Sequence, residues 1–388
     1  MAEDFELLST SLRPEANLLL CCARTQMDDA NAERIVRLLQ RNIDWTYLLK
    51  MALRHNLVPL LYWSLEAVAP ATIPEDARVE LREQSQVNIQ GNLFLTKELL
   101  HLLALFSRHD IQVLPYKGPV LAAAVYGNLA LRPSNDLDIL VHERDILQAT
   151  DLLVSSGYEI IRPAGIAHAG KHLQSLRIKQ LVEKSPWAYQ LVLYHPDRQT
   201  LVELHWRITP RYIFPDSPEE LWEDLRPVTV GGATVLSLSP ENLLWFLCLH
   251  GAKHQWKRLN WLCDIAELIR EYSHLNWEEV VTQATTLGIE RRLYLGLLLA
   301  DGMLNSSIPE AIGTKIHGTP HVEALAHLVA EWMFEDTDQT ARFPYLERFA
   351  FQLRAFDRMA DRGRYLLRFA DGMDIAFRAD RGLTKLLG

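Results

Sequence analysis

The chain has 388 residues, which is too long for one ordinary hydrophobic core and indicates two or three domains. Hydrophobic residues make up 48% of the chain and charged residues 23%, so long disordered stretches are not expected. The formal net charge of −9 argues against a general nucleic-acid-binding protein, although a pocket for a small anion needs only a few local positive charges.

Cysteine content and hydropathy indicate where such a chain would reside. None of the cysteines forms a Cys-x-x-Cys pair, and two adjacent ones lie in an apolar run, so we expect buried reduced thiols at Cys21, Cys22, Cys248 and Cys263. The first residues are acidic, which is unlike a signal peptide. No stretch approaches 18 uninterrupted apolar residues. These features predict a cytoplasmic protein without a membrane partner.

Residues 1–110 are predicted to form an N-terminal helical region. Apolar residues recur at helical spacing in this part of the chain, for example at Ile35, Leu38 and Leu39. Residues 70–76 break the helices with two prolines, and Pro74 is a natural start for the next helix. We expect an all-α packing or cap region here.

The periodicity changes at Ile111, where a short strand is predicted to run to Lys117-Gly118. A helix over 119–126 follows, with proline in its first turn, where a missing N–H does no harm. A second, largely apolar strand then carries Asp136 and Asp138. Strand side chains alternate between faces, so both carboxylates should emerge on one face. Two such carboxylates repel each other and lose hydration, which favours a hard divalent cation such as Mg²⁺ between them. The alternative is a capped or salt-bridged strand start.

The next segments are a helix over 143–156, a third strand over 158–161 and a loop-rich stretch over 162–187. Residues 189–194 and 200–206 then read as a β-hairpin with a five-residue turn. Glu203 and His205 would share one face of the second hairpin strand. Glu203 is therefore a candidate third metal ligand, and His205 a residue that orients the ligands. The alternatives are an exposed hairpin position for Glu203 and an ordinary surface position for His205.

Residues 228–236 predict another hairpin with a Gly-Gly turn, and the chain is predicted to be helical from Ser239 onwards. The expected fold class is α+β, with a small mixed β-sheet core over 111–236. Helical regions over 1–110 and 237–388 would flank this core. The arginine-rich segment over 342–388 fits a solvated helix face better than an RNA-binding surface, given the acidic chain.

Together, the Lys117-Gly118 turn and the Asp136-Leu137-Asp138 strand resemble the signature of the DNA polymerase β-like nucleotidyltransferase superfamily. More narrowly, the motif order resembles a branch of uncharacterised bacterial nucleotidyltransferases, over roughly residues 95–275. The segments that carry this resemblance are Tyr116-Lys117-Gly118, Tyr126, Arg132, the strand over 136–141, and the helical segments over 250–254 and 261–265. Two features depart from the superfamily pattern: Pro119 replaces the usual second glycine or serine, and the gap from Gly118 to Asp136 is longer.

The resemblance implies transfer of a nucleotidyl group from an NTP to a hydroxyl or similar acceptor, with release of pyrophosphate. It implies that Asp136 and Asp138 hold one Mg²⁺ at the triphosphate, and that with Glu203 they hold a second that lowers the pKa of the acceptor, with Mn²⁺ as a substitute metal. Lys117 or Arg132 would neutralise the pyrophosphate, and the backbone at Gly118 would bind phosphate. The acceptor would be a small molecule, a peptide or a protein. The acidic net charge makes a tRNA end a weaker choice.

His250 and His254 lie one helical turn apart, which is a spacing used by zinc sites, but the glutamate that a metalloprotease needs as a base is missing. His254, together with Lys253 or Lys257 and with Arg258, would instead line the nucleotide side of the cleft. The alternative is an ordinary amphipathic helix whose polar groups are solvated. Asp264 would hold one of these cations in a salt bridge. Two other functions remain open: a degenerate nucleotidyltransferase that binds nucleotide or a partner without turnover, and a helical interaction protein.

Overall fold

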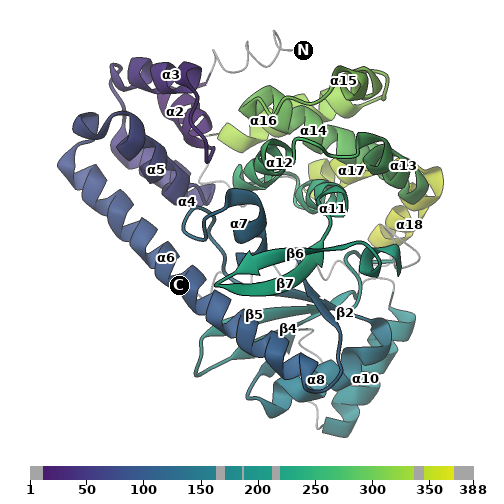
Figure 1. Ribbon diagram of the computed structural model, residues 1–388. Coiled ribbons are helices and arrows are strands. Elements are labelled where there is room, and N and C mark those ends of the chain that lie inside the picture. The colour runs from purple at the N-terminus through teal and green to yellow at the C-terminus, as the bar shows by residue number, and fades with distance from the viewer. Residues whose placement is uncertain (1–11, 163–170, 186–187, 212–218, 336–344, 371–388) are drawn as a thin grey trace.

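The computed structural model describes residues 12–162, 171–185, 188–211, 219–335 and 345–370. Helices from both ends of the chain form the upper part of the molecule in Figure 1, and a β-sheet formed by the middle part of the chain lies below them. The predicted α+β fold class, with a small mixed sheet flanked by helical regions, is thereby confirmed.

The N-terminal part is helical, as predicted. Aspartate side chains cap two of its helices, because Asp28 accepts a hydrogen bond from the amide of Asn31 and Asp44 accepts one from the amide of Tyr47. The helices are α2 (Pro14–Cys22), α3 (Asp29–Leu39), α4 (Trp45–Arg54), α5 (Val58–Val68), the short η1 (Pro70–Thr72) and α6 (Glu75–Ser107).

Helix α6 has 33 residues and runs along the side of the molecule from the N-terminal helices to the sheet (Figure 1). Near its middle, Asn88 and Asn92 face the loop that leads into the strand with the aspartates. The Asn88 side-chain amide donates to the carbonyl of Ala130 at 2.7 Å. The Asn92 amide donates to the carbonyls of Leu129 at 2.5 Å and Arg132 at 2.8 Å. Helix α6 therefore holds this loop in place.

The five-stranded sheet has the order β1-β2-β5-β4-β3 in the described part of the chain. Strands β2 and β5 pair in parallel and the other neighbours pair antiparallel, so the sheet is mixed. Helices α8 and α10 lie at the end of the molecule where the sheet lies (Figure 1). The strands are β1 (Val113–Pro115), β2 (Leu137–Val141), β3 (Glu159–Arg162), β4 (Gln190–His195) and β5 (Thr200–His205), and the elements between them are α7 (Pro119–Tyr126), η2 (Glu143–Asp145), α8 (Ile146–Ser155) and α10 (Lys171–Lys184).

Two sequence expectations in this region need correction. The stretch expected to be loop-rich contains helix α10. Its exposed Leu173 and Leu176 obscure the buried pair Ile178 and Val182, so the sequence shows no clear apolar stripe. The hairpin turn is also shorter by one residue, because His195 still pairs with the first residue of β5.

The second predicted hairpin is confirmed. Strands β6 (Leu225–Val230) and β7 (Ala233–Leu238) pair antiparallel. Gly231 and Gly232 in the turn have φ of 57° and 83°, which glycine adopts without strain. The Ser237 hydroxyl donates to the carbonyl of Pro115 at 2.9 Å, and this bond ties the hairpin to the end of β1.

The C-terminal part is helical, and the predicted cap at Ser239 accepts a hydrogen bond from the amide of Asn242. The elements are η3 (Glu219–Trp222), α11 (Pro240–Lys253), α12 (Asn260–Glu271), α13 (Trp277–Leu287), α14 (Glu290–Leu304), α15 (Glu310–His317), α16 (Val322–Phe334), α17 (Tyr345–Ala355) and α18 (Met359–Ala370). The part of the arginine-rich segment over 371–388 lies outside the described residues. Within the described part, Arg358 donates to the carbonyls of Thr285 and Thr286 at the end of α13.

Two hydrophobic cores organise the described residues. One joins the N-terminal helices to the C-terminal ones, and the other lies between the sheet, the C-terminal half of α6 and helices α8 and α10. A polar contact also links the N-terminal and C-terminal helices: the His55 ring accepts a hydrogen bond from the backbone amide of Leu259 at 3.1 Å. These cores run across the boundaries at 110 and 236, so the three-part division stays a prediction.

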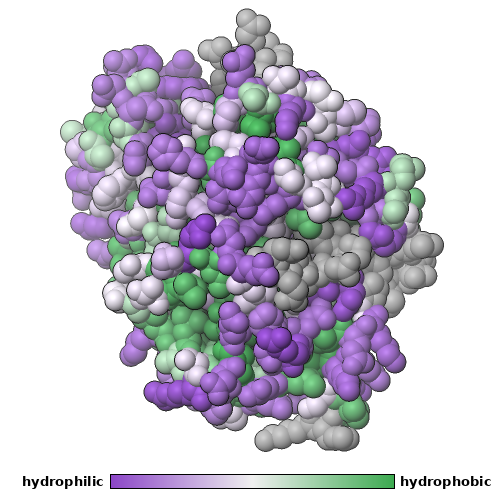
Figure 2. All heavy atoms as spheres, turned by 45° about the vertical axis from the view of Figure 1, so that its right-hand side comes forward, coloured by the Kyte–Doolittle hydropathy of each residue, from purple (hydrophilic) through white to green (hydrophobic). Residues whose placement is uncertain are grey.

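The described surface is mixed in character. The face drawn in Figure 2 is mostly hydrophilic, with hydrophobic side chains interspersed. Large hydrophobic side chains that are exposed on α6 include Val87, Leu93 and Phe94. All four cysteines are buried free thiols, as expected. Among the described helices, none is both long and apolar enough to span a membrane.

Candidate metal and nucleotide site

The register of β2 and β5 brings two acids side by side. In this parallel pair, Asp138 lies opposite Glu203, and Leu140 lies opposite His205. Alternation along the strands sends Ile139 and Leu204 into the core beneath, where both are fully buried. Asp138, Glu203 and His205 consequently point to the other face of the sheet, next to the turn after β1.

These three side chains form a compact group of possible metal ligands. Each offers one ligand atom, and the three atoms all lie within 4.8 Å of one another. Nε2 of His205 lies 3.2 Å from Oδ1 of Asp138 and 3.5 Å from Oε2 of Glu203. Carboxylate oxygens suit Mg²⁺ and Mn²⁺, and an imidazole suits transition metals better than Mg²⁺. Sequence reasoning gave His205 only an orienting role, but its distance to both carboxylates makes it a candidate ligand as well.

Lys117 supplies a positive charge at the same point. Its Nζ lies 2.7 Å from Oδ1 of Asp138, and its side chain is 13% exposed. Burial lowers the pKa of Lys117, but the charges of Asp138, Asp136 and Glu203 outweigh burial and raise it above the usual value. Lys117 thus places a positive charge directly beside Asp138, and a divalent cation between the acids stays a prediction.

The carboxylates differ in their preferred protonation states. Burial raises the pKa of Asp138, but Lys117 and the hydrogen bond from His205 lower it well below its usual range. Asp136 has the opposite balance, because burial and the negative charges of Asp138 and Glu203 raise its pKa to about 7. Asp136 therefore holds its proton more readily than an ordinary aspartate, whereas Asp138 is held ionised.

Asp136 is placed differently from its expected strand position. Strand β2 begins at Leu137, and Asp136 forms a bend directly before it. Its carboxylate lies outside the group formed by Asp138, Glu203 and His205. The predicted strand was therefore longer than β2 by at least this one residue. The role of Asp136 as a metal ligand remains a prediction.

Gly118 occupies a backbone conformation that excludes a side chain. Its φ is 59° and its ψ is −134°, and an added Cβ would lie 3.0 Å from the carbonyl oxygen of Asp136. The turn after β1 therefore packs directly against the bend before β2. Gly118 is also the N-cap of α7, and Pro119 removes the first N–H of that helix.

We expect Gly118→Ala to lower the free energy of unfolding by about 3 kcal/mol, because the new methyl group adds a close contact to a strained backbone conformation. Gly127→Ala is the matched control. Gly127 has φ of 61° and ψ of 0° with nothing within 4 Å of an added Cβ, so its replacement should cost about 1 kcal/mol. Urea unfolding of both variants measures the difference. Equal losses would contradict the close approach to Asp136.

Arg132 and Asp264 form a buried pair rather than occupying separate places in the cleft. The guanidinium Nε and Nη2 of Arg132 donate to the two carboxylate oxygens of Asp264 at 2.7 and 3.0 Å. The Tyr126 hydroxyl donates to the same carboxylate at 2.7 Å. Asp264 was expected to hold a cation from the segment over 253–258, and it holds Arg132 instead. This pair joins the loop before β2 to helix α12.

The residues predicted on the C-terminal helices lie in different settings. Lys253 donates a short hydrogen bond to the Tyr189 hydroxyl, and its Nζ lies 4.6 Å from the centre of that ring. The Tyr189 ring is in turn 5.7 Å from the His205 ring. His254 is partly exposed at the C-terminus of α11, whereas Arg258 is exposed.

Sequence reasoning missed several rings near the acids. Tyr116 is 5.7 Å from the His205 ring and 4.9 Å from the Phe246 ring. Phe246 and His250 follow one another on α11 at 6.1 Å. The spacing of four residues between Phe246, His250 and His254 indicates that they share one helix face, but the same spacing is typical of an ordinary apolar helix face.

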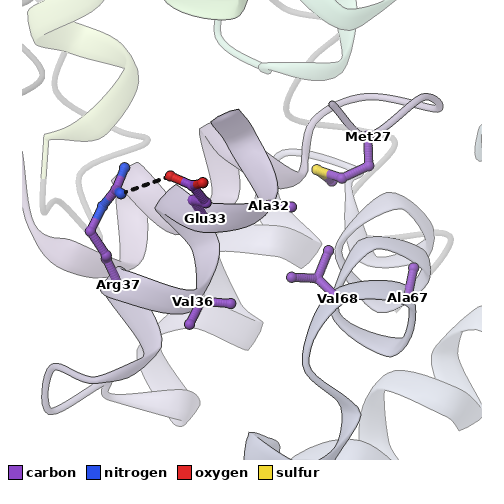
Figure 3. Close-up of a pocket in the computed structure, with 7 residues that line it drawn as sticks. All are labelled: Met27, Ala32, Glu33, Val36, Arg37, Ala67 and Val68. Atoms are coloured by element: carbon purple, nitrogen blue, oxygen red, sulfur yellow. Dashed lines mark hydrogen bonds and ion pairs between the residues drawn. The ribbon is translucent and has the colours of Figure 1, made fainter. Parts of the chain in front are cut away.

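A hollow elsewhere on the surface lies between α3 and α5 (Figure 3). Glu33 and Arg37 at its rim form an exposed ion pair at 3.3 Å. This hollow is separate from the acids, and it is lined by Met27, Ala32, Glu33, Val36, Arg37, Ala67 and Val68.

Comparison with known proteins identifies the family of the chain. A family model described as an uncharacterised nucleotidyltransferase matches residues 41–305. None of the curated proteins matches the chain. Among solved structures, the chain is similar to an antigenic nucleotidyltransferase-like protein from Paracoccidioides brasiliensis, with 19% identity and a TM-score of 0.29. That match covers 59% of this chain and 95% of the other. The extent of the family match shows that the chain belongs to the family of uncharacterised nucleotidyltransferases.

Proposed function

We propose that this protein is a metal-dependent nucleotidyltransferase that moves a nucleotidyl group from an NTP to a hydroxyl acceptor and releases pyrophosphate. The observation that carries the proposal is the register of β2 and β5, which sets Asp138 beside Glu203 with His205 next to both. Membership of the nucleotidyltransferase family supports the same class of reaction.

The donor set fits a divalent cation. Two carboxylates and an imidazole lie close enough to share one ion, and Asp136 lies in the bend directly before β2. Burial, followed by the negative charges of Asp138 and Glu203, raises the pKa of Asp136, and a bound cation would favour its ionised form. Bound there, Mg²⁺ or Mn²⁺ would neutralise triphosphate charge and make the acceptor hydroxyl more acidic.

The protein's own groups would bind and orient the reactants. The Lys117 side chain contacts Asp138 in this structure. With NTP bound, its ammonium group would contact the phosphate oxygens that leave as pyrophosphate. The turn at Gly118 would let the triphosphate approach the backbone at the start of α7. A bond forms between the acceptor oxygen and the α-phosphorus, and the bond from that phosphorus to the bridging oxygen breaks. The pyrophosphate keeps the electron pair, and a site carboxylate takes the acceptor proton.

Other predicted residues have less direct roles in this proposal. Lys253 and His254 would face the nucleotide from α11, and Arg258 would add positive charge at the rim. Arg132 and Asp264 would position the loop before β2 rather than touch the nucleotide, because they bind each other. We propose a small molecule, a peptide or a protein as the acceptor and the cytoplasm as the location.

We expect the protein to release pyrophosphate from labelled NTPs and to transfer the label to an acceptor in a cell extract, with both dependent on a divalent metal. Chelation by EDTA should abolish both signals, because without the metal the carboxylates of this site would repel the negatively charged triphosphate. Added Mg²⁺ or Mn²⁺ should restore them. Pyrophosphate release that persists at full rate after chelation would contradict the role assigned to the acids.

A second candidate is a protein of this family that binds nucleotide without turnover. Two observations favour it: Lys117 and His205 already pair with Asp138, and Pro119 removes a helix N–H that could bind phosphate. Calorimetry distinguishes the two. NTP binding that ignores Mg²⁺, without pyrophosphate release, would favour this candidate.

A further inference from the structure

A row of ring side chains extends from the acid group along helix α11. It begins at Tyr116, which contacts both His205 and Phe246. It continues along one face of α11 through Phe246, His250 and His254, which are four residues apart. The His250 and His254 ring centres lie 4.7 Å apart.

Trp261 of helix α12 completes this row. Its ring lies 5.5 Å from that of His250 and 5.2 Å from that of His254. We call His250, His254 and Trp261 the ring cluster. All three are partly exposed, whereas Phe246 is buried. The ring cluster is therefore the accessible end of the row.

The ring nitrogens of His250, His254 and Trp261 make no hydrogen bond with the part of the chain that the structure describes. The adjacent Lys253, by contrast, is engaged with Tyr189. Rings that serve only as core bury their polar edges against partners or keep them covered. Partly exposed rings with free polar edges, beside a site for a charged ligand, can contact a planar polar group.

The charge on these rings is also suited to a planar ligand. Burial first, then the positive charges of Lys117 and Lys253, lower the pKa of both His250 and His254 well below the usual value. Both imidazoles are thus neutral near pH 7 and offer π faces and a ring acceptor. The Lys117 ammonium lies 6.0 Å from the centre of the Phe246 ring, so the row starts where the triphosphate would bind.

We propose that the ring cluster of His250, His254 and Trp261 stacks the nucleobase of the NTP. This inference rests on the proposed function, because it places the triphosphate at Lys117 and the acids. Stacking accepts every base, since every base has a π face. The enzyme is therefore permissive for the base and depends on the ring cluster for affinity rather than for selectivity.

The test compares ATP, GTP, CTP and UTP with inorganic tripolyphosphate, which has the phosphates but no base. Calorimetry with Mg²⁺ and without acceptor gives the dissociation constants. We expect the wild type to bind all four NTPs within about 10-fold of one another and more tightly than tripolyphosphate. Trp261→Leu and His254→Ala should each weaken NTP binding roughly 5- to 100-fold and leave tripolyphosphate binding unchanged.

Matched controls separate stacking from a general loss of structure. Trp63→Leu and His101→Ala make the same changes at exposed positions on α5 and α6, and they should leave every constant unchanged. Trp261→Phe keeps a ring and should retain most of the NTP affinity, even if Trp261→Leu folds poorly.

The outcomes separate this inference from the proposed function. If NTPs and tripolyphosphate bind equally well, or if Trp261→Leu weakens both by the same factor, the ring cluster does not stack the base, although the triphosphate site stands. If one NTP binds more than about 100-fold better than the others, the permissive site is wrong. If neither NTP nor tripolyphosphate binds, the proposed function fails and this inference fails with it.

Discussion

Asp138→Asn is expected to lower nucleotidyl transfer by on the order of 10³-fold or more. Asp138 is 2% exposed and is the one carboxylate in contact with both Lys117 and His205 among the described contacts. The substitution keeps the size of the side chain but removes the charge that would hold the metal. Initial rates of pyrophosphate release from labelled NTP, measured with saturating Mg²⁺, give the ratio.

The control for this prediction must separate chemistry from folding, because the substitution leaves the Lys117 charge without its partner. Asp151→Asn makes the same change at an exposed position on α8 and should keep full activity. Glu203→Gln is the second test, since the Glu203 carboxylate pairs with His205. It should also reduce the rate strongly while the protein still unfolds cooperatively. If both Asp138→Asn and Glu203→Gln fold and retain the wild-type rate, these acids are not catalytic.

Asp264→Leu is expected to lower the free energy of unfolding by about 3–5 kcal/mol, because it leaves the buried Arg132 guanidinium unpaired. Arg132 is 7% exposed and Asp264 is 1% exposed. The Tyr126 hydroxyl would lose its acceptor at the same time. Urea unfolding followed by fluorescence and circular dichroism measures the change.

A double-mutant cycle gives this prediction its control. The single variants Arg132→Met and Asp264→Leu each leave a buried charge alone, but the double variant leaves neither. We expect the double variant to be more stable than either single variant. The surface pair of Arg37 and Glu33 is the matched comparison, and breaking it should cost less than about 1 kcal/mol. Additive losses for Arg132 and Asp264 would contradict a strong interaction between them.

The sequence predicts the fold well where local periodicity decides the structure. The helix over 119–126, the second hairpin and the capped start of α11 follow from proline, glycine and serine at positions where their local chemistry applies. The pairing of Glu203 with Asp138 also agrees with the expectation that the hairpin acid faces the acid strand. These are short-range or single-face arguments, and a linear sequence contains the information they need.

Apart from the pairing of Glu203 with Asp138, the sequence does not predict the contacts between distant elements that build the site. The partner of Asp264 is 132 residues earlier in the chain, and no spacing rule connects Arg132 with it. The position of His205 between two carboxylates likewise depends on the stagger of β2 against β5. If the register of β5 against β2 changed by one residue, the His205 ring would lie beside different residues. The same holds for the ring cluster, whose members come from two helices that the sequence describes only as amphipathic.

Helix α6 has a mechanical consequence for the site. Its N-terminal half packs in the helical core and its C-terminal half packs in the sheet core. At about 1.5 Å per residue, the helix is roughly 50 Å long. Near its midpoint, Asn88 and Asn92 hold the loop before β2 through hydrogen bonds. Because a continuous helix resists bending far more than a loop does, the distance between the helical core and the acid strand is set by a rigid part. We therefore expect any closure around a substrate to come from side chains and loops, with little change in the spacing of the two cores.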